Sequence, residues 1–422
     1  MSSPMSALNA ARPAPPRPPR NSRLLAAGAW LVAFAAAFAP SAAAADFSKS
    51  VVFERGESGY PIFRIPAIVE AANGDLLAFA EARQGGDASE IDLVLKRSID
   101  RGQTWTGLTV VQDDEAFRKY ADSPDQPLTV GNPAPVVDRA DPDHPGRIWL
   151  PFTLENARVF VTYSDDHGET WAPRREITAA VKRPDWGWYA TGPVHGIQLR
   201  RGPHSGRLVV PCDHRLGDSG ADRGPNGAHA ILSDDHGATW RLGAIDDTYE
   251  DGLNANETTV VELNDGRLYF NTRDQNGPAP GARGEAFSRD GGDTLERITG
   301  LYSLYRPSER TLDTPVVQSA LLRAESTLDG GPADVILFSG PDENGPTGPG
   351  RSDLRIRCSF DEARSWQDGP LIHEGFAAYS DLVRLGDGAY GVLFEAGKDG
   401  AGYQQILFAR FTLADLTPPP SP

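Results

Sequence analysis

Arginine and acidic side chains offer the chemistry in this sequence that is easiest to place. Arg64 lies in the tetrapeptide FRIP, residues 63–66, and a guanidinium can bind a carboxylate through two parallel hydrogen bonds. A single arginine in a strand is more often a salt-bridge partner, so Arg64 needs companions to form a site. Asp138, Asp141 and Asp143 could bind calcium, but the prolines among them favour a plain solvated turn. The eight histidines show no metal-ligand spacing, and we expect no metal and no organic cofactor.

The first 45 residues differ from the rest of the chain. They contain four arginines, no acidic residue and an apolar run from Leu24 to Ala39 that is too short to span a bilayer. Small residues follow the run, so we expect cleavage near Ala44 or Ala45 and interpret residues 1–45 as a secretory signal peptide. A membrane anchor is the less favoured alternative. We therefore expect one domain over residues 46–422, secreted or periplasmic, with no integral membrane segment after removal of the signal.

Charge and composition narrow the class of protein. The chain has 41 Lys and Arg against 58 Asp and Glu, a formal net charge of −17, which disfavours binding to nucleic acid or to an anionic membrane surface. Its 44 Gly and 35 Pro favour short strands and turns over a helical bundle. Cys212 and Cys358 lie in strand-like runs and are interpreted as buried thiols, although the two could pair.

An octapeptide of the form S-x-D-x-G-x-T-W occurs three times, and two degenerate copies follow. The copies span residues 98–105, 164–171, 233–240, 288–295 and 359–366. In each copy an Asp side chain can accept backbone N–H bonds around a hairpin turn, and the glycine can take a positive φ. One copy per unit of about 60 residues leaves room for four strands, and about six such units fit the chain, within the range of propeller blade counts. We therefore expect an all-β propeller in which these repeats are structural.

The repeats resemble the Asp-boxes of the sialidase (neuraminidase) family, in particular those of bacterial-type exo-α-sialidases. The tetrapeptide at residues 63–66 is similar to the F/Y-R-I-P signature near the start of sialidase domains. The resemblance extends from about Val51 to Phe411, with all of its segments in family order. It implies a six-bladed β-propeller with a pocket in which Arg64 has several companions.

Those companions are implied by further segments that match the family pattern. The resemblance gives these roles: Arg83 beside the pocket, Asp87 as acid and base, Glu257 as the base for the nucleophile, Arg273 and Arg351 as substrate-binding arginines, Tyr379 as the nucleophile and Glu395 as the residue that orients Arg64. Glu257 precedes Arg273 by 16 positions, as in the family pattern. Asp92 competes with Asp87 for its role, but it alternates with apolar neighbours and is placed on the outer face of a strand.

The chemistry of these residue types agrees with the resemblance. A sialic acid carries a carboxylate on its anomeric carbon, which guanidinium groups bind well and which would repel an acidic nucleophile. A phenol with an ordinary pKa of about 10 is protonated at neutral pH, so Tyr379 would need Glu257 to take its proton. Asp87 would protonate the leaving oxygen and then activate water. The expected outcome is retention at the anomeric carbon.

We therefore expect an exo-α-sialidase that removes terminal α-ketosidically linked sialic acids from glycoproteins, glycolipids or oligosaccharides. A trans-sialidase of the same fold would share every site residue and differ in how water reaches the intermediate. A non-catalytic sialoglycan-binding propeller would keep the arginines but would not need the pair of Tyr379 and Glu257. Trp186, Trp188 and Tyr189 resemble a segment at the pocket rim, where aromatic rings could stack on sugar, although a core role for one tryptophan is equally open.

Overall fold

The computed structural model describes residues 47–217, 224–277, 283–298, 300, 302–308 and 311–416. The expected signal peptide, residues 1–45, lies outside these residues and stays a prediction. Both cysteines are described, and Cys212 and Cys358 are free and buried. The interpretation of the two as buried thiols is therefore confirmed.

Antiparallel strands form five sheets among the described residues. The first sheet contains β2 (Ile62–Glu70), β3 (Leu76–Arg83), β4 (Ile91–Ser98) and β5 (Thr109–Gln112) in that order. The second has the order β10-β9-β8-β6 with β7 also paired to β8, and contains β6 (Val130–Gly131), β7 (Val136–Asp138), β8 (Arg147–Leu154), β9 (Arg158–Ser164) and β10 (Arg175–Glu176).

The third and fourth sheets follow in chain order. The third has the order β11-β13-β14-β15 with β12 paired to β13, and contains β11 (Trp186–Thr191), β12 (Ile197–Gln198), β13 (Leu208–Leu216), β14 (Asn226–Ser233) and β15 (Arg241–Ile245). The fourth contains β16 (Ala255–Glu262), β17 (Leu268–Asp274), β18 (Arg283–Ser288) and β19 (Arg306–Pro307) in that order.

The fifth sheet has seven strands and joins the two ends of the described chain. Its order is β1-β25-β24-β23-β22-β21-β20, with β1 (Lys49–Glu54), β20 (Ala320–Glu325), β21 (Val335–Pro341), β22 (Ser352–Ser359), β23 (Gln367–Arg384), β24 (Tyr390–Lys398) and β25 (Ala401–Phe411). Short helical turns connect the strands: η1 (Glu57–Gly59), η2 (Asp114–Tyr120), α1 (Thr178–Val181), η3 (Gly202–His204), η4 (Thr327–Asp329) and α2 (Leu413–Leu416).

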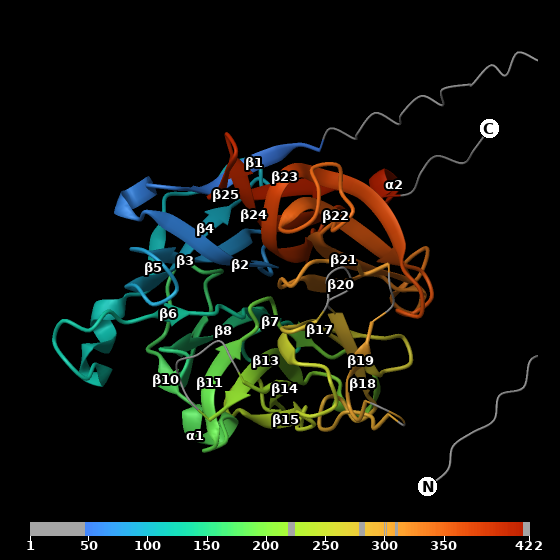
Figure 1. The fold of residues 1–422 in the computed structure, drawn as a ribbon, viewed down its shortest axis with the longest axis horizontal. Coiled ribbons are helices and arrows are strands. Elements are labelled where there is room, and N and C mark those ends of the chain that lie inside the picture. The colour runs from blue at the N-terminus through green and yellow to red at the C-terminus, as the bar shows by residue number, and fades with distance from the viewer. Residues whose placement is uncertain are drawn as a thin grey trace, which may run out of the picture. The chain divides into compact units, whose positions relative to one another are not determined.

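The sheets follow one another in chain order around a centre, as Figure 1 shows. The hydrophobic core lies between neighbouring sheets, where Phe79 and Leu95 of the first sheet pack in one cluster with Phe152 and Phe160 of the second. Burial of such apolar surface between the sheets is the main favourable contribution to folding. The prediction of an all-β, propeller-like fold is confirmed.

The repeated octapeptides form the hairpin turns that their sequence predicts. In the first copy, Asp100 Oδ1 accepts hydrogen bonds from Thr104 N and Ser98 Oγ, both at 2.8 Å. These bonds, above all those from Thr104, lower the pKa of Asp100 to about 2. Gly102 has φ +85°, and a Cβ built on it would lie 2.1 Å from Phe408. The glycine is therefore needed both for its conformation and for the close approach of the neighbouring strand.

Two histidines are buried in the third sheet. The Nδ1 atoms of His214 and His229 lie 3.1 Å apart, and the His214 ring stacks on Trp186 at a centroid distance of 3.7 Å. Burial lowers the pKa of both imidazoles well below its usual value, so this buried histidine pair is neutral in the folded protein. Trp186 and Tyr189 are 1% and 0% exposed. Trp186 therefore takes the core role that was left open for one tryptophan, whereas the expectation of Tyr189 at a pocket rim is wrong because it is also buried in the core.

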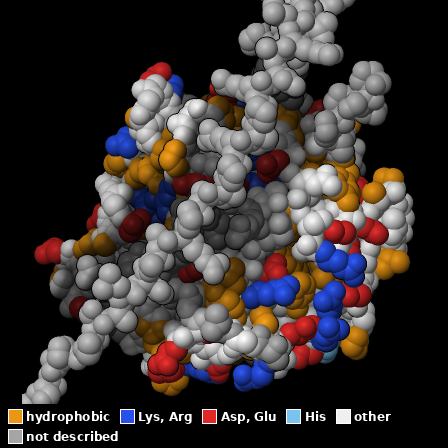
Figure 2. All heavy atoms as spheres, turned by 45° about the vertical axis from the view of Figure 1, so that its right-hand side comes forward, with side chains coloured by type: hydrophobic (Ala, Val, Ile, Leu, Met, Phe, Trp, Pro, Cys, Tyr) orange, Lys and Arg blue, Asp and Glu red, His pale blue; other side chains and the backbone are white. Residues whose placement is uncertain are grey.

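On the face drawn in Figure 2, Lys and Arg side chains lie beside Asp and Glu side chains, so charges of both signs are interspersed there. Ion pairs between exposed or partly exposed side chains occur among the described residues, such as Arg147 with Asp165 at 2.7 Å. Among the described residues, no helix is both long enough and apolar enough to cross a membrane.

Candidate active site

Seven of the eight predicted site residues line one cavity of about 730 Å³. They are Arg64, Arg83, Asp87, Glu257, Arg273, Arg351 and Tyr379. The eighth, Glu395, is 1% exposed and lies behind the wall of the cavity. The sequence motifs, which span more than 300 residues, therefore converge on a single place.

Irregular strand pairing supports three of these side chains. The register shifts between Arg64 and Ala67 in β2, across Glu257 in β16, and across Tyr379 in β23. Such bulges change the direction in which a side chain points, and they recur next to active sites. The polar side chains are therefore turned into the cavity from strands that otherwise alternate between the two faces of a sheet.

Tyr379, Glu257 and Arg273 form a hydrogen-bonded triangle. The Tyr379 hydroxyl donates to Glu257 Oε1, and Arg273 Nη1 donates to Glu257 Oε2 at 2.8 Å and to the Tyr379 hydroxyl at 3.2 Å. Tyr379 and Glu257 are 6% and 9% exposed. Burial and the charge of Glu257 raise the pKa of Tyr379, although the nearby arginines oppose this shift. The phenol is therefore protonated at neutral pH, with a carboxylate placed to receive its proton.

Glu395 connects the first arginine to the tyrosine. Its Oε1 accepts from Arg64 Nε at 2.5 Å and from the backbone N–H of Ile65 at 2.9 Å. Its Oε2 accepts from the backbone N–H of Tyr379 at 3.2 Å. One buried carboxylate thus holds β2 and β23 in a fixed relation at the cavity wall. Its contact with Arg64 was predicted, whereas its contact with Tyr379 was not.

The hydrogen-bond partners of Arg351 are both neutral. Arg351 Nη1 donates to the Tyr403 hydroxyl at 2.8 Å, and Nη2 donates to the Val316 carbonyl at 3.4 Å. Within the described part of the chain, Arg351 makes no ion pair. The Arg64 guanidinium lies 4.2 Å from the centroid of the Tyr403 ring and 5.3 Å from that of Tyr379. Positive charge is therefore concentrated around two phenol rings, where it can receive an anion.

Asp87 lies at the mouth of the cavity with 88% of its side chain exposed. It forms an ion pair with Arg83 Nη1, and Arg64 Nη1 lies 4.0 Å away. Partial desolvation would raise the pKa of the Asp87 carboxyl, but the charges of Arg83, Arg64 and Arg351 lower it overall. Asp87 is therefore ionised at neutral pH in the absence of a bound anion.

Asp92, the competitor for Asp87, makes contacts outside the cavity. Its Oδ2 accepts from the Tyr60 hydroxyl at 2.5 Å, and its Oδ1 accepts from the backbone N–H of Asp114 at 2.8 Å. Asp92 therefore connects β4 to η2 and faces away from the arginines.

Two residues that hold the arginines of the site, Glu81 and Tyr403, were not predicted from the sequence. Glu81 is 3% exposed and accepts from Arg83 Nε at 2.8 Å and from Asn132 N at 2.8 Å, so it fixes Arg83. Tyr403 holds Arg351 as described. Trp188 does line the cavity, as the aromatic segment predicted. Glu81 could have been found from its position two residues before Arg83 in a strand, whereas Tyr403 carried no signal in the sequence.

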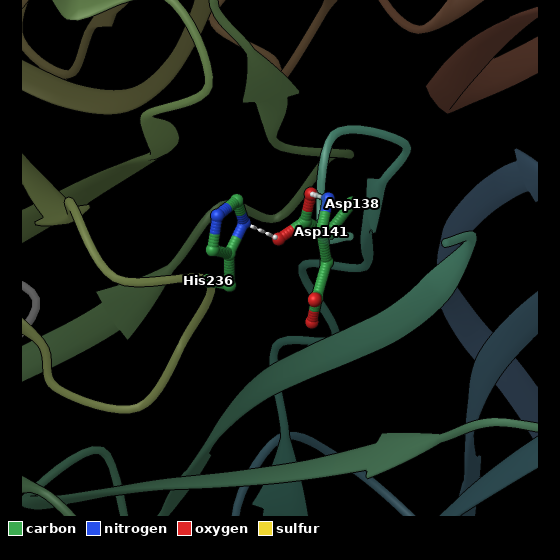
Figure 3. A group of neighbouring side chains, drawn as sticks. All are labelled: Asp138, Asp141 and His236. Atoms are coloured by element: carbon green, nitrogen blue, oxygen red, sulfur yellow. Dashed lines mark hydrogen bonds and ion pairs between the residues drawn. The ribbon is translucent and has the colours of Figure 1, made fainter. Parts of the chain in front are cut away.

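The acidic turn at residues 138–143 was predicted to be solvated, and Asp143 is exposed as expected, but Asp138 and Asp141 are buried. Asp138 and Asp141 are 0% and 6% exposed. The Nδ1 atom of His236 lies 2.8 Å from Asp138 Oδ2, and Figure 3 shows the two side chains facing each other. Asp138 Oδ1 also accepts from Asp141 N at 3.0 Å and from Gln198 Nε2 at 2.5 Å. Both oxygens of Asp138 are thus occupied: Oδ1 binds within the turn and to β12, and Oδ2 connects the β7–β8 turn to the octapeptide of the next sheet. This turn lies outside the cavity.

Comparison with known proteins places these observations in a family. A family model described as a BNR repeat-like domain matches residues 74–392. A sialidase from Micromonospora viridifaciens is 33% identical over 86% of this chain, which spans about half (53%) of that protein. An exo-alpha-sialidase from Aspergillus fumigatus is 30% identical, with 84% of this chain and 85% of that protein covered.

Solved structures agree with the sequence relatives. A Hadza microbial sialidase is similar with a TM-score of 0.70 and 27% identity, covering 87% of this chain and 69% of that one. A leech intramolecular trans-sialidase has a TM-score of 0.67 and 18% identity, covering 88% and 71%, a similarity of fold alone. Together with the matches above, the fold and the octapeptide repeats show that the chain belongs to the sialidase family of glycoside hydrolases.

Proposed function

We propose that the protein is an exo-α-sialidase that cleaves terminal α-linked sialic acids from glycoconjugates with retention, through a covalent intermediate on Tyr379. The observation that carries the proposal is the hydrogen bond from Tyr379 to Glu257 inside a ring of arginines. A protein that only bound sialoglycans would need the positive charge but not a buried phenol paired with a base. The exo-alpha-sialidase relatives support the same reading.

The substrate carboxylate would bind Arg64, Arg273 and Arg351. Guanidinium groups bind carboxylates through charge-assisted hydrogen bonds, which are stronger in a cavity that excludes water. Arg64 is held rigidly by Glu395, and Arg351 by Tyr403, so little ordering is needed when the anion binds. This arrangement would place the anomeric carbon beside the Tyr379 hydroxyl.

In the first step, Tyr379 Oη would bond to the anomeric carbon while its proton passes to Glu257 Oε1. The aglycone oxygen would leave with a proton from Asp87. In the second step, Asp87 would take a proton from a water molecule. The oxygen of that water would attack the anomeric carbon from the face that the aglycone left. Tyr379 would then leave and recover its proton from Glu257. Two displacements at one carbon give net retention.

The ion pair of Asp87 with Arg83 adds a condition to this mechanism. In the free protein the arginines lower the pKa of Asp87, which opposes its role as an acid. A bound substrate carboxylate would neutralise the charge of Arg64 and Arg351 and so raise the pKa of Asp87. We infer that substrate binding itself prepares the acid.

We also infer six blades. β23 pairs with β22 through its first half and with β24 through its second half. The seven-stranded sheet therefore divides into two four-stranded blades that share this strand, and the other four sheets supply one blade each.

Export of the protein is proposed on the signal-like residues 1–45. N-terminal sequencing of protein from the medium or periplasm should begin near residue 46. An intact N-terminus on the exported protein would contradict the assignment.

The test of the proposed function is product analysis with a matched pair of tyrosine variants. The full chain should release free sialic acid from sialyllactose, and proton NMR should detect the α-anomer first. Tyr379→Phe should lower kcat/KM by at least about 100-fold, because removal of a group that acts directly in the reaction has effects of this size or larger. The control is Tyr60→Phe, since Tyr60 also donates to a carboxylate, Asp92, but lies outside the cavity.

Three results would each reject part of the proposal. Initial release of the β-anomer would reject retention. Release of a 2,7-anhydro sugar or transfer to lactose in place of free sialic acid would favour a trans-sialidase. Binding of sialyllactose without any turnover would favour the sialoglycan-binding alternative.

A further inference from the structure

A second cavity, of about 540 Å³, lies at the opposite ends of the strands that carry the active-site residues. β2 contributes Arg64 to the first cavity and Ile68 to the second, and β23 contributes Tyr379 to the first and Leu382 to the second. β16 likewise contributes to both. At about 3.3 Å per residue, the two cavities are separated by about 10 Å of strand. The second cavity is therefore distinct from the proposed active site.

The walls of the second cavity are apolar. Its lining includes Val137, Ile197, Leu199, Val260, Leu322 and Leu382. Its volume falls within the range of about 300–1,000 Å³ that is typical of small-molecule sites. Such walls suit a hydrocarbon body.

A buried histidine provides a polar group on the lining of this cavity. His195 is 9% exposed, and its Nδ1 lies 2.7 Å from Oδ1 of Asp381, which is itself 0% exposed. Asp381 Oδ2 also accepts from the backbone N–H of His195 at 3.1 Å and of Ile68 at 2.9 Å, so the ring is held in place. Among the described residues, His195 Nε2 makes no hydrogen bond, whereas Nδ1 and the backbone N–H both contact Asp381. The ring therefore offers a nitrogen to a molecule in the cavity.

The contact with Asp381 favours the protonated form of the His195 ring, in which Nε2 is a donor. Burial alone would lower the pKa of His195, but the charge of Asp381 and its hydrogen bond raise it overall. In its protonated form the ring carries a hydrogen on each nitrogen, one on Nδ1 toward Asp381 and one on Nε2. A buried cationic donor of this kind is satisfied by an anion.

Arginines surround the mouth of the cavity. Arg139, Arg200 and Arg384 are exposed lining residues. Arg200 pairs with Asp329 at 3.4 Å, whereas Arg139 donates to the Glu70 carbonyl at 2.8 Å and makes no ion pair within the described residues. The cavity lining carries an excess of positive charge, because its five arginines outnumber Glu70, Glu262 and Asp329. It would attract an anion toward the His195 ring.

We propose that the second cavity binds a small organic anion with an apolar body, such as a medium-chain carboxylate. The carboxylate accepts the hydrogen bond of His195 Nε2, and the hydrocarbon lies against the aliphatic walls. Arg139 adds positive charge at the mouth. The site does not depend on the activity proposed for the first cavity.

The test is calorimetric titration of the full-length protein with octanoate, octanamide and butyrate. Octanoate should bind with a submillimolar Kd. Octanamide, which keeps the chain length but lacks the charge, and butyrate, which keeps the charge but shortens the chain, should each bind about tenfold more weakly or worse.

Three variants locate the bound octanoate. His195→Gln and Arg139→Ala should each raise its Kd about tenfold or more. Arg351→Ala, which alters only the first cavity, should leave the Kd unchanged. Arg139 is exposed, so its variant keeps the test valid even if His195→Gln fails to fold. Failure of octanoate to bind at millimolar concentration, equal binding of octanamide, or loss of binding in Arg351→Ala alone would overturn the proposal.

Discussion

Replacement of Arg351 by alanine tests the carboxylate-binding role of the arginines. Its guanidinium lies 5.6 Å from the centroid of the Tyr379 ring and is held by the Tyr403 hydroxyl at 2.8 Å. Because its hydrogen-bond partners in the described chain are a hydroxyl and a carbonyl, its charge is available to the substrate. Arg351→Ala should therefore weaken substrate binding with little effect on the fold.

The size of the effect follows from the hydrogen bonds lost. A hydrogen bond to a charged group contributes about 1.5–3 kcal/mol, and about 1.4 kcal/mol corresponds to a tenfold change. One lost bond therefore predicts a fall in kcat/KM of about 10- to 150-fold, and loss of a bidentate pair predicts a larger one. Arg158→Ala, which removes an exposed ion-paired arginine of β9, should have no effect on kcat/KM.

The assay compares sialyllactose with its methyl ester, in which the carboxylate charge is removed. If Arg351 acts on that charge, Arg351→Ala should cost one to two orders of magnitude in kcat/KM on the acid and much less on the ester. The difference between the two losses, expressed as free energies, isolates the interaction between guanidinium and carboxylate, as in a double-mutant cycle. Equal losses on both substrates would refute the assigned role of Arg351.

Three further predictions concern the acid, a turn and the buried histidine pair. Asp87→Ala should lose far more kcat/KM on sialyllactose than on an aryl sialoside, whose leaving group needs little protonation, and the same selectivity in Asp92→Ala instead would reverse the assignment. Gly237→Ala should destabilise by about 1–3 kcal/mol more than Gly206→Ala in urea unfolding, because both glycines have positive φ but only at Gly237 would a Cβ meet Trp149, at 2.0 Å. Burial lowers the pKa of the buried histidine pair below the ordinary value of about 6.5, so the unfolded chain binds more protons and the free energy of unfolding should fall as the pH drops below about 6.5. A slope between pH 7 and 6 that is unchanged after replacement of both histidines by glutamine would contradict the last prediction.

The repeated turns could be predicted because their interactions are local. Ser98, Asp100 and Thr104 bond to one another within a few residues, so residue type and spacing determine the turn. The site residues could be assigned in advance because each lies in a segment that resembles a family motif. Their convergence in one cavity depends on how the sheets pack around the centre, which the motifs alone do not describe.

Apart from the contact of Glu395 with Arg64, which the family resemblance implied, the contacts that position the site could not be predicted, because they depend on strand register and on distant partners. The register shift across Tyr379 depends on how β23 pairs with β24. Tyr403 lies 52 positions from Arg351 in the sequence, and the backbone of Tyr403 has a φ of +53°. Asp138 was expected in a solvated turn, yet its partner His236 comes from the next sheet. Long-range contacts of this kind leave no local pattern in the sequence.

The central claim is that Tyr379 forms a covalent bond with the sugar, and trapping of the intermediate tests it most directly. A 3-fluorosialyl fluoride slows the second step more than the first, so a covalent adduct should accumulate on the intact protein. Mass spectrometry should show the mass of one fluorosialyl group, mapped to the peptide that contains Tyr379, and no adduct in Tyr379→Phe. An adduct mapped to another residue, or turnover of sialosides without any adduct, would contradict the account.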